Sequence, residues 1–222
     1  MGKLIVFEGT DGTGKSTQYA RACERLEAQN VRFEKIKFPQ YDEPSSALIK
    51  MYLAGEFGSD PEKINPYAAS TFYAVDRYAG FARGWKDFYD KGGLIVCDRY
   101  TTSNAVHQGS KLKKEEQGDF FTWLYDLEYD KMGLPKPDLV LCFDMPTELA
   151  HLLREKRDTQ GVGASDIHEH AEAYLSRCRE TARLAAKHYG WTLISCVEEG
   201  RLRSIEDIHE EVYRHMKACL EG

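Results

Sequence analysis

Ten residues near the N-terminus combine three glycines, a lysine and hydroxyl side chains at a spacing suited to binding phosphate. They read EGTDGTGKST over 8–17. Glycines let the backbone turn tightly, so that its N–H groups point inward and bind polyphosphate at a helix N-terminus. In this pattern the lysine reaches the β- and γ-phosphates, and the hydroxyl of the residue directly after the lysine is a ligand for Mg²⁺. The predicted ATP-binding residues are Gly9, Thr10, Asp11, Gly12, Thr13, Gly14, Lys15, Ser16 and Thr17.

The flanks of this segment decide between a phosphate-binding loop and a plain Gly-rich turn. An apolar run over 4–7 precedes it, and a stretch with helical periodicity over 15–29 follows it. Strand, loop and helix in this order are the context in which the pattern G-x-x-x-x-G-K-[ST] binds phosphate. The sequence therefore favours the phosphate-binding loop.

A second candidate group follows a later apolar run, where the chain reads Asp98, Arg99, Tyr100. In a protein with a phosphate-binding loop, a carboxylate at the end of a buried strand is placed to orient Mg²⁺, so Asp98 joins Ser16 as a predicted metal ligand. Arg99 adds a fork of donors near the same phosphates. The alternative is an Asp–Arg pair that only caps the strand, and the presence of the loop favours the functional interpretation.

Apolar runs and helical periodicities alternate along the chain, which would place both motifs at one edge of a parallel sheet. The predicted class is α/β, a P-loop NTPase three-layer sandwich with a five-stranded parallel sheet flanked by helices. Strands are expected at 3–8, 32–37, 93–97, 138–143 and 192–196. Helices are expected at 15–29, 44–54, 66–90, 115–131, 146–158, 166–189 and 204–219.

The chain is predicted to form a single domain over 1–222, because no linker, repeat or low-complexity segment divides it. The stretch DTQGVGAS over 158–165 is instead expected to belong to a mobile lid of about 151–168. The six cysteines are scattered and no apolar stretch is long enough to span a membrane, which favours a cytoplasmic protein with reduced thiols. A net charge of −6 argues against a nucleic-acid partner.

The ordered set of motifs resembles thymidylate kinases, over residues 3 to about 196. The matching stretches are 9–17, Phe38-Pro39-Gln40-Tyr41, Asp76-Arg77, Asp98-Arg99-Tyr100-x-x-Ser103-Asn104, and Arg154-x-x-Arg157 followed by Asp166-x-x-Glu169. The resemblance implies a nucleoside monophosphate kinase domain that phosphorylates dTMP to dTDP with ATP and Mg²⁺ by direct in-line transfer, for dTTP synthesis. It also implies a homodimer.

The same resemblance implies an acceptor site for dTMP. Asp11 would accept the sugar 3′-hydroxyl and help to orient Arg99, which would hold the dTMP phosphate. Tyr73 and Arg77 lie four residues apart on one helix face, so a stacking ring and a donor to a thymine carbonyl can address one ligand. The other implied acceptor-site residues are Phe38, Tyr41, Asn104, His107 and Gln108.

Cations for the transferred phosphoryl group are expected from the lid. Some family members carry an Arg where this chain has Gly12, and others supply cations from a lid; here Arg154 and Arg157 are the candidates. With Lys15 and Arg99 they complete the predicted catalytic set. Two departures from the family pattern concern the acceptor side: Gln40 replaces a common Arg, and His107 replaces the usual aromatic residue beside the place of a ribose 2′-hydroxyl.

Two alternatives to this function stay open from the sequence. One is a kinase for another deoxynucleotide or for a deoxynucleoside, because the identity of the base depends on Tyr73, Arg77 and Asn104 alone. The other, from a different class, is a non-catalytic nucleotide-binding P-loop module. A guanine-specific switch is disfavoured because the chain has no Asn-Lys-x-Asp motif.

Overall fold

The predicted parallel sheet of five strands is present in the structure, a computed structural model that describes residues 1–58, 60–158 and 172–222. The strand order is β2-β3-β1-β4-β5 and every pairing is parallel. The strands are β1 (Lys3–Glu8), β2 (Phe33–Lys37), β3 (Leu94–Asp98), β4 (Leu139–Asp144) and β5 (Thr192–Ser195). From β1 the chain continues to β2 toward one edge of the sheet, and from β3 it continues to β4 toward the other edge. The strand order therefore reverses between β1 and β3, and ligands bind at the carboxyl ends of the strands at such a switch point.

The central strands bury both faces, which explains their continuous apolar runs. Along β1, Leu4 and Val6 belong to one core cluster, whereas Ile5 and Phe7 belong to the other. Successive side chains of a strand point to opposite faces, so each central strand contributes to two cores. The sheet is therefore the middle layer of three.

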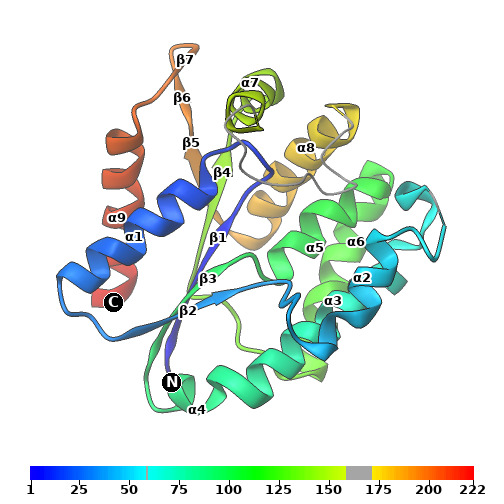
Figure 1. Cartoon of the computed structure of the whole chain (residues 1–222), viewed down its shortest axis with the longest axis horizontal. Coiled ribbons are helices and arrows are strands. Elements are labelled where there is room, and N and C mark those ends of the chain that lie inside the picture. The colour runs from blue at the N-terminus through cyan, green and yellow to red at the C-terminus, as the bar shows by residue number, and fades with distance from the viewer. Residues whose placement is uncertain (59, 159–171) are drawn as a thin grey trace.

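Helices cover the two faces of the sheet unequally (Figure 1). On one face α1 (Lys15–Ala28) packs beside α9 (Ile205–Glu221). The other face carries the larger aromatic core and most of the remaining helices. These are α3 (Pro66–Gly80), α4 (Lys86–Asp90), α5 (Thr101–His107), α6 (Lys114–Tyr125) and α8 (Glu172–Tyr189), with α2 (Ala47–Leu53) against α3. Helix α7 (Thr147–Asp158) contacts α8 but buries Ala150 in the core of the α1 and α9 face.

Several elements differ from the sequence prediction. The helix expected over 66–90 contains a π-helical turn, Phe81–Trp85, between α3 and α4, and a second one, Asp126–Lys131, follows α6. Helix α5 directly after β3 was not predicted, and neither was the hairpin of β6 (Val197–Glu198) and β7 (Arg201–Leu202). Both are too short for their periodicity to be recognised. The expected helix over 166–189 is described only from Glu172, and most of 158–165 lies outside the described residues.

The last helix illustrates how local sequence sets a boundary. Ser204 precedes α9, and its Oγ accepts a hydrogen bond from the backbone N of Asp207 at 3.0 Å. Such a cap satisfies one of the free N–H groups of the first turn. Within the part of the chain that the structure describes, no helix is long and apolar enough to cross a membrane.

Candidate active site

The loop between β1 and α1 has the backbone geometry that its glycines predict. Gly12 and Gly14 have φ of 86° and 79°, in the left-handed region where a side chain is disfavoured. A Cβ at Gly12 would also collide with the carbonyl oxygen of Ala150 in α7. This structure thus leaves no room at that position for an Arg, which some family members carry there.

Lys15, the first residue of α1, meets Asp98, the last residue of β3. The Nζ of Lys15 forms an ion pair with Oδ1 of Asp98, and both residues are buried. Burial and the nearby charge of Arg99 lower the pKa of Lys15, although Asp98 acts in the opposite direction. Ser16 is exposed at the start of α1. Lys15 and Asp98 are therefore in contact beside the loop, and the roles of Ser16 and Asp98 as metal ligands stay predictions.

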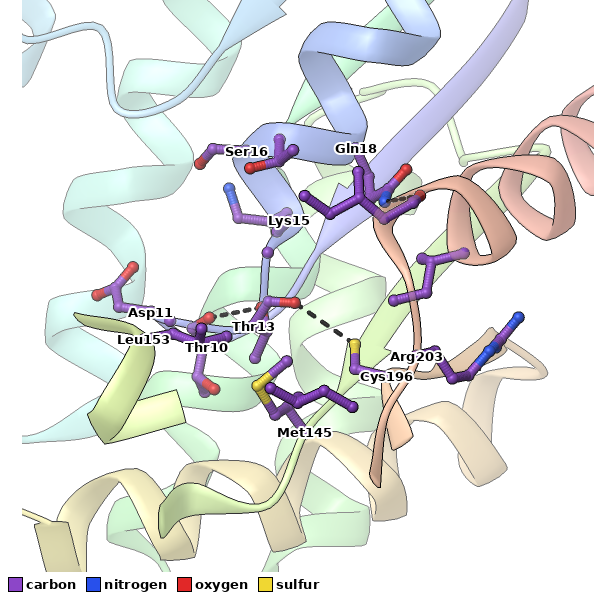
Figure 2. A pocket seen from close by; sticks show the side chains of 16 residues that line it. Thr10, Asp11, Thr13, Lys15, Ser16, Gln18, Met145, Leu153, Cys196 and Arg203 are labelled. Carbon is purple, nitrogen blue, oxygen red and sulfur yellow. Dashed lines mark hydrogen bonds between the residues drawn. The ribbon is translucent and has the colours of Figure 1, made fainter. Parts of the chain in front are cut away.

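A cavity of about 420 Å³ opens beside this loop (Figure 2). Its wall is largely apolar, and a flat apolar ligand group in contact with a phosphate loop would fit there. The loop lines one side with Thr10 to Thr17. The remaining side chains were not predicted. They come from α1, α7, α9, the hairpin and the segments after β4 and β5: Gln18, Met145, Leu153, Cys196, Leu202, Arg203, Ile205 and Ile208.

Hydrogen bonds fix the far wall of this cavity to the loop. Cys196 Sγ contacts the backbone oxygen of Thr13 at 3.4 Å, and Gln18 Nε2 donates to the backbone oxygen of Ile205 at 2.9 Å (Figure 2). Arg203 Nη1 donates to the backbone oxygen of Ser195 at 2.8 Å. The end of β5, the hairpin and the start of α9 are thereby held against α1.

Arg99 lies immediately after β3 and is not among the residues that line this cavity. Its backbone φ of 68° is in the left-handed region, which costs a non-glycine residue energy and is often found at functional sites. Nη2 donates to Oδ1 of Asp11 at 2.9 Å, and Nη1 lies 3.1 Å from Nε2 of His107. Burial opposes the charge of Arg99, but Asp11 and Glu8 outweigh burial and raise its pKa. The predicted contact between Asp11 and Arg99 is present.

Glu8 is a site residue that was not predicted. It is 0% exposed at the end of β1, and its Oε1 accepts a hydrogen bond from the backbone N of Gly9 at 2.9 Å. Its Oε2 accepts from the hydroxyls of Thr102 and Ser103 at 2.6 and 2.7 Å. Oε1 also lies 3.8 Å from Nη1 of Arg99. One buried carboxylate therefore joins the phosphate-binding loop, α5 and Arg99.

Arg77 is buried and forms an ion pair with a second buried side chain, Glu128. It is 2% exposed, and its Nε and Nη2 donate to the two carboxylate oxygens of Glu128 at 2.6 and 2.5 Å. Nη1 donates to the backbone oxygen of Tyr100 at 3.4 Å. Burial opposes its charge, but Glu128 raises the pKa of Arg77. The ion pair with Glu128 gives Arg77 a structural role that the sequence did not predict. A guanidinium has five N–H groups, so the same side chain can also donate to thymine, and that contact stays a prediction.

The other predicted base-site residues lie on α3 and α5. Tyr73 is half-buried, and its ring meets the edge of Tyr52 at a centroid distance of 6.2 Å. Asn104 Nδ2 donates to the backbone oxygen of Ser70 at 3.0 Å. Gln108 is 2% exposed, and its Oε1 has no hydrogen-bond partner among the residues the structure describes. Such a buried acceptor is costly unless a ligand satisfies it.

Phe38 and Tyr41, predicted to line the acceptor site, differ in exposure. Phe38 follows β2, is buried, and packs against the ring of Tyr100 at a centroid distance of 6.0 Å. Tyr41 is 41% exposed, and its phenol makes a minor contribution to the raised pKa of Arg99. Tyr41 therefore lies near Arg99, and the predicted contacts of Phe38 and Tyr41 with the acceptor stay predictions.

Comparison with known proteins identifies the family. The family model described as thymidylate kinase matches residues 7–212. The chain belongs to the thymidylate kinase family. It is 31% identical over 211 residues to the thymidylate kinase of Mycobacterium tuberculosis H37Rv, an alignment that covers 90% of this chain and 94% of the relative. It is 29% identical over 215 residues to that of Plasmodium falciparum, covering 97% and 90%.

A solved structure has the same fold. The thymidylate kinase of Candida albicans superposes with a TM-score of 0.71 at 20% identity, covering 98% of this chain and 92% of that one. At this identity the likeness concerns the fold. The recognised family, the phosphate-binding loop and the five-stranded parallel sheet thus agree on an ATP-dependent nucleoside monophosphate kinase.

The predicted lid residues lie on α7 and in the segment that follows it. Arg154 and Arg157 belong to α7, but their side chains lie outside the described residues. Asp166 and Glu169, in the segment 159–171, lie outside them as well. The assignment of these residues to the lid stays a prediction.

Proposed function

We propose that this thymidylate kinase transfers the γ-phosphoryl group of ATP directly to a phosphate oxygen of dTMP, giving dTDP and ADP. The observation that carries the proposal is the position of Arg99. Its Nη2 donates to Oδ1 of Asp11 in the phosphate-binding loop at 2.9 Å, and Arg99 is not among the residues that line the cavity. A cation fixed there can bind the acceptor phosphate opposite the triphosphate, as in-line transfer requires.

The cavity of Figure 2 is the proposed site of ATP. The loop N–H groups and Lys15 would bind the β- and γ-phosphates. The apolar wall formed by Met145, Leu202 and Ile205 would cover the base. Lys15 now forms an ion pair with Asp98, so we expect the triphosphate to draw its Nζ partly away from that carboxylate.

The residues beside the loop suit Mg²⁺. It prefers hard oxygen ligands and is typically bound through one or two carboxylates together with substrate phosphates. Asp98 and the hydroxyl of the exposed Ser16 supply such oxygens. When bound, Mg²⁺ would neutralise charge on the transferred phosphoryl group.

The acceptor needs no strong general base, because the dTMP phosphate is already an anion. The work of the chain is therefore to position two anions and to offset their repulsion. Lys15 and Arg99 do so from the described part of the chain. Arg154 and Arg157 are the proposed mobile cations that close over the transferred group.

Recognition of thymine is proposed to depend on α3 and α5. The ring of Tyr73 offers a flat apolar partner, and the free Oε1 of Gln108 offers an acceptor for an N–H group of the base. His107, next to Gln108, is the residue at which a ribose 2′-hydroxyl would meet the chain. Polar groups that are buried and left unpaired reject wrong ligands strongly.

A homodimer in the cytoplasm completes the proposal. All six cysteines are unpaired, and five of them are buried, which suits a reducing compartment. Val75 and Tyr78 expose apolar surface on α3, at 49% and 47%, and such surface can pack against a second copy.

The test is ADP release with Mg-ATP and a panel of acceptors: dTMP, dUMP, dGMP, UMP and thymidine. We expect a strong rate with dTMP, a weaker one with dUMP, and loss of the dTMP rate in Arg99→Ala. A rate confined to another monophosphate or to thymidine would overturn the assigned acceptor. Binding of ATP with no acceptor-dependent release would move the chain to the class of non-catalytic nucleotide-binding modules.

A further inference from the structure

Lys111 is a half-buried lysine in the 3₁₀ turn Gly109–Lys111 that follows α5. Its backbone N donates to the backbone oxygen of Gln108 at 3.2 Å, so the two residues belong to one turn. Burial lowers the pKa of Lys111 to about 8, although the charge of Glu62 acts in the opposite direction. Lysines usually keep the ammonium group in water. The amine of Lys111 has therefore exchanged part of its hydration for contacts with the chain.

The phenol of Tyr52 provides such a contact. Nζ of Lys111 donates to Oη of Tyr52 at 2.9 Å and lies 5.1 Å from the centroid of the ring. Tyr52 belongs to α2 and is 1% exposed. Glu62, the nearby carboxylate, forms an ion pair with Arg177. A hydrogen bond from a charged donor is stronger than one between neutral groups, so Lys111 restrains the hydroxyl end of a buried ring.

The ring of Tyr52 packs against the ring that is proposed to stack on thymine. Tyr52 and Tyr73 meet edge to face, with centroids 6.2 Å apart and an interplanar angle of 81°. Tyr73 lies on α3, against which α2 packs. In such a pair the positive edge of one ring faces the negative face of the other, which favours one relative orientation. The orientation of Tyr73 thus depends on that of Tyr52.

A second contact joins α3 and α5 directly. Asn104 Nδ2 donates to the backbone oxygen of Ser70 at 3.0 Å. Ser70 comes three residues before Tyr73, and Asn104 comes four residues before Gln108, which is about one helical turn in each case. Asn104 therefore connects α5 to α3 directly, whereas Lys111 connects the turn after α5 to α3 through α2. Both contacts restrain the spacing between Tyr73 and Gln108, the residues proposed to bind the base.

We infer that Lys111 is a positioning residue for the acceptor base: through Tyr52 it holds the ring of Tyr73 in the orientation in which that ring stacks on thymine. The inference rests on the proposed function, in which Tyr73 is the flat apolar partner of the base. It extends the acceptor site to α2 and to the turn after α5. Loss of the Lys111 donor should therefore weaken binding of the base and leave ATP binding and the rate of phosphoryl transfer unchanged.

The test measures the dissociation constants of dTMP, thymidine and ADP by calorimetry for wild type, Lys111→Met, Tyr52→Phe and the double variant. Met keeps an unbranched side chain and removes the donor, whereas Phe keeps the ring and removes the hydroxyl that accepts from Lys111. Thymidine has no phosphate, so it reports on the base and the sugar alone. Lys114→Met, which replaces an exposed lysine at the start of α6, is the matched control.

We expect Lys111→Met and Tyr52→Phe each to bind dTMP about fivefold more weakly than wild type, the scale of one hydrogen bond. The double variant should bind as Tyr52→Phe does, because both substitutions remove the same contact. Thymidine should lose affinity by the same factor as dTMP. The affinity for ADP and the kcat with dTMP should stay at wild-type values, and Lys114→Met should match wild type throughout.

Three results would overturn the inference. A loss in the double variant equal to the product of the two single losses would show that Lys111 does not act through Tyr52. A loss of dTMP affinity without a loss for thymidine would place the effect at the phosphate. An equal loss for ADP would show a general effect on the fold.

Urea denaturation of the same four proteins reports on the contact without nucleotide. The two substitutions should be coupled in the free energy of unfolding, because they remove one shared hydrogen bond. Additive effects on unfolding would overturn the contact itself. Coupling together with no binding of dTMP by wild type would instead overturn the proposed function, and with it the role of Lys111 in binding the base. The failure of the one is thus distinguishable from the failure of the other.

Discussion

The two sides of the phosphate-binding loop are built in different ways. On the ATP side, contiguous loop residues face an open cavity of about 420 Å³, and their main tool is backbone N–H groups. On the proposed acceptor side, Arg99 contacts Glu8 and Asp11 from the segment of the loop and His107 from α5. The first side relies mainly on one stretch of sequence, whereas the second joins that stretch to Arg99 after β3 and to His107 in α5.

This difference predicts how strongly side-chain substitutions affect binding on each side. A backbone site tolerates many side-chain changes in its wall, because glycines and a helix N-terminus do most of the binding. A network of buried charged groups fails when one member is removed, because the remaining partners are left unpaired. Substitutions should therefore have small effects on the ATP wall and large ones around Arg99, with Lys15 as the exception that acts on the reacting phosphate.

Lys15→Met should have the largest effect. Removing the cation that faces the transferred group should lower kcat about a thousandfold, the scale of losing one preorganised electrostatic contact. Lys37→Met, which removes an exposed lysine at the end of β2, is the control and should keep the wild-type rate. Steady-state kinetics with dTMP checks both. A loss below tenfold in Lys15→Met would show that the loop works through its backbone alone.

Glu128→Ala should have the next largest effect, on stability. It leaves the guanidinium of Arg77 buried without its carboxylate, and we expect a loss of about 3 kcal/mol in the free energy of unfolding. Asp126→Ala breaks an exposed ion pair with Lys131 in the same π-helical segment and should cost less than about 1 kcal/mol. Urea denaturation measures the two. Equal losses would mean that Arg77 is not a structural partner of Glu128.

Glu8→Gln tests the residue that joins the two sides. The amide cannot accept every hydrogen bond that the carboxylate accepts, and it loses the charge near Arg99. We expect the KM for dTMP to rise about tenfold and the KM for ATP to rise less, since Glu8 touches the ATP side only through Gly9. Glu24→Gln, on the exposed side of α1, should change neither. A larger effect on ATP would reverse the assignment of Glu8 to the acceptor side.

Leu202→Ala should have the smallest effect. Leu202 lines the cavity, and trimming it should raise the KM for ATP about fivefold, the value of roughly 1 kcal/mol of lost apolar contact. Val197 pairs with Leu202 across the hairpin but does not line the cavity, so Val197→Ala is the matched control. Both variants should keep the wild-type kcat. A loss of kcat in Leu202→Ala would mean that the wall positions the phosphates as well as the base.

The same contrast governs what the sequence could reveal. The sheet, most helices and the loop follow from local patterns: apolar runs such as 94–97, helical periodicity, and a phosphate motif with the right flanks. The contact of Asp11 with Arg99 followed from the family resemblance. Ser204 could be recognised as the start of a helix because its cap is local.

The unpredicted parts depend on contacts between distant residues. Glu8 lies next to the motif, but nothing in its neighbours indicates that Thr102 and Ser103 would bind it. Arg77 and Tyr73 share a helix face as predicted, yet only the fold brings Glu128 to that guanidinium. Leu202 and Arg203 reach the cavity through a hairpin too short to recognise from periodicity.

The most direct test of the difference between the two sides is the Arg99→Ala variant, with the dissociation constants of dTMP and ADP measured separately by calorimetry and compared with those of wild type. We predict that dTMP binding weakens about a hundredfold, because Arg99 is the fixed cation of the acceptor side, whereas ADP binding changes less than about threefold. Loss of ADP affinity equal to that of dTMP would contradict the separation of the site into a backbone-built ATP side and a side-chain-built acceptor side.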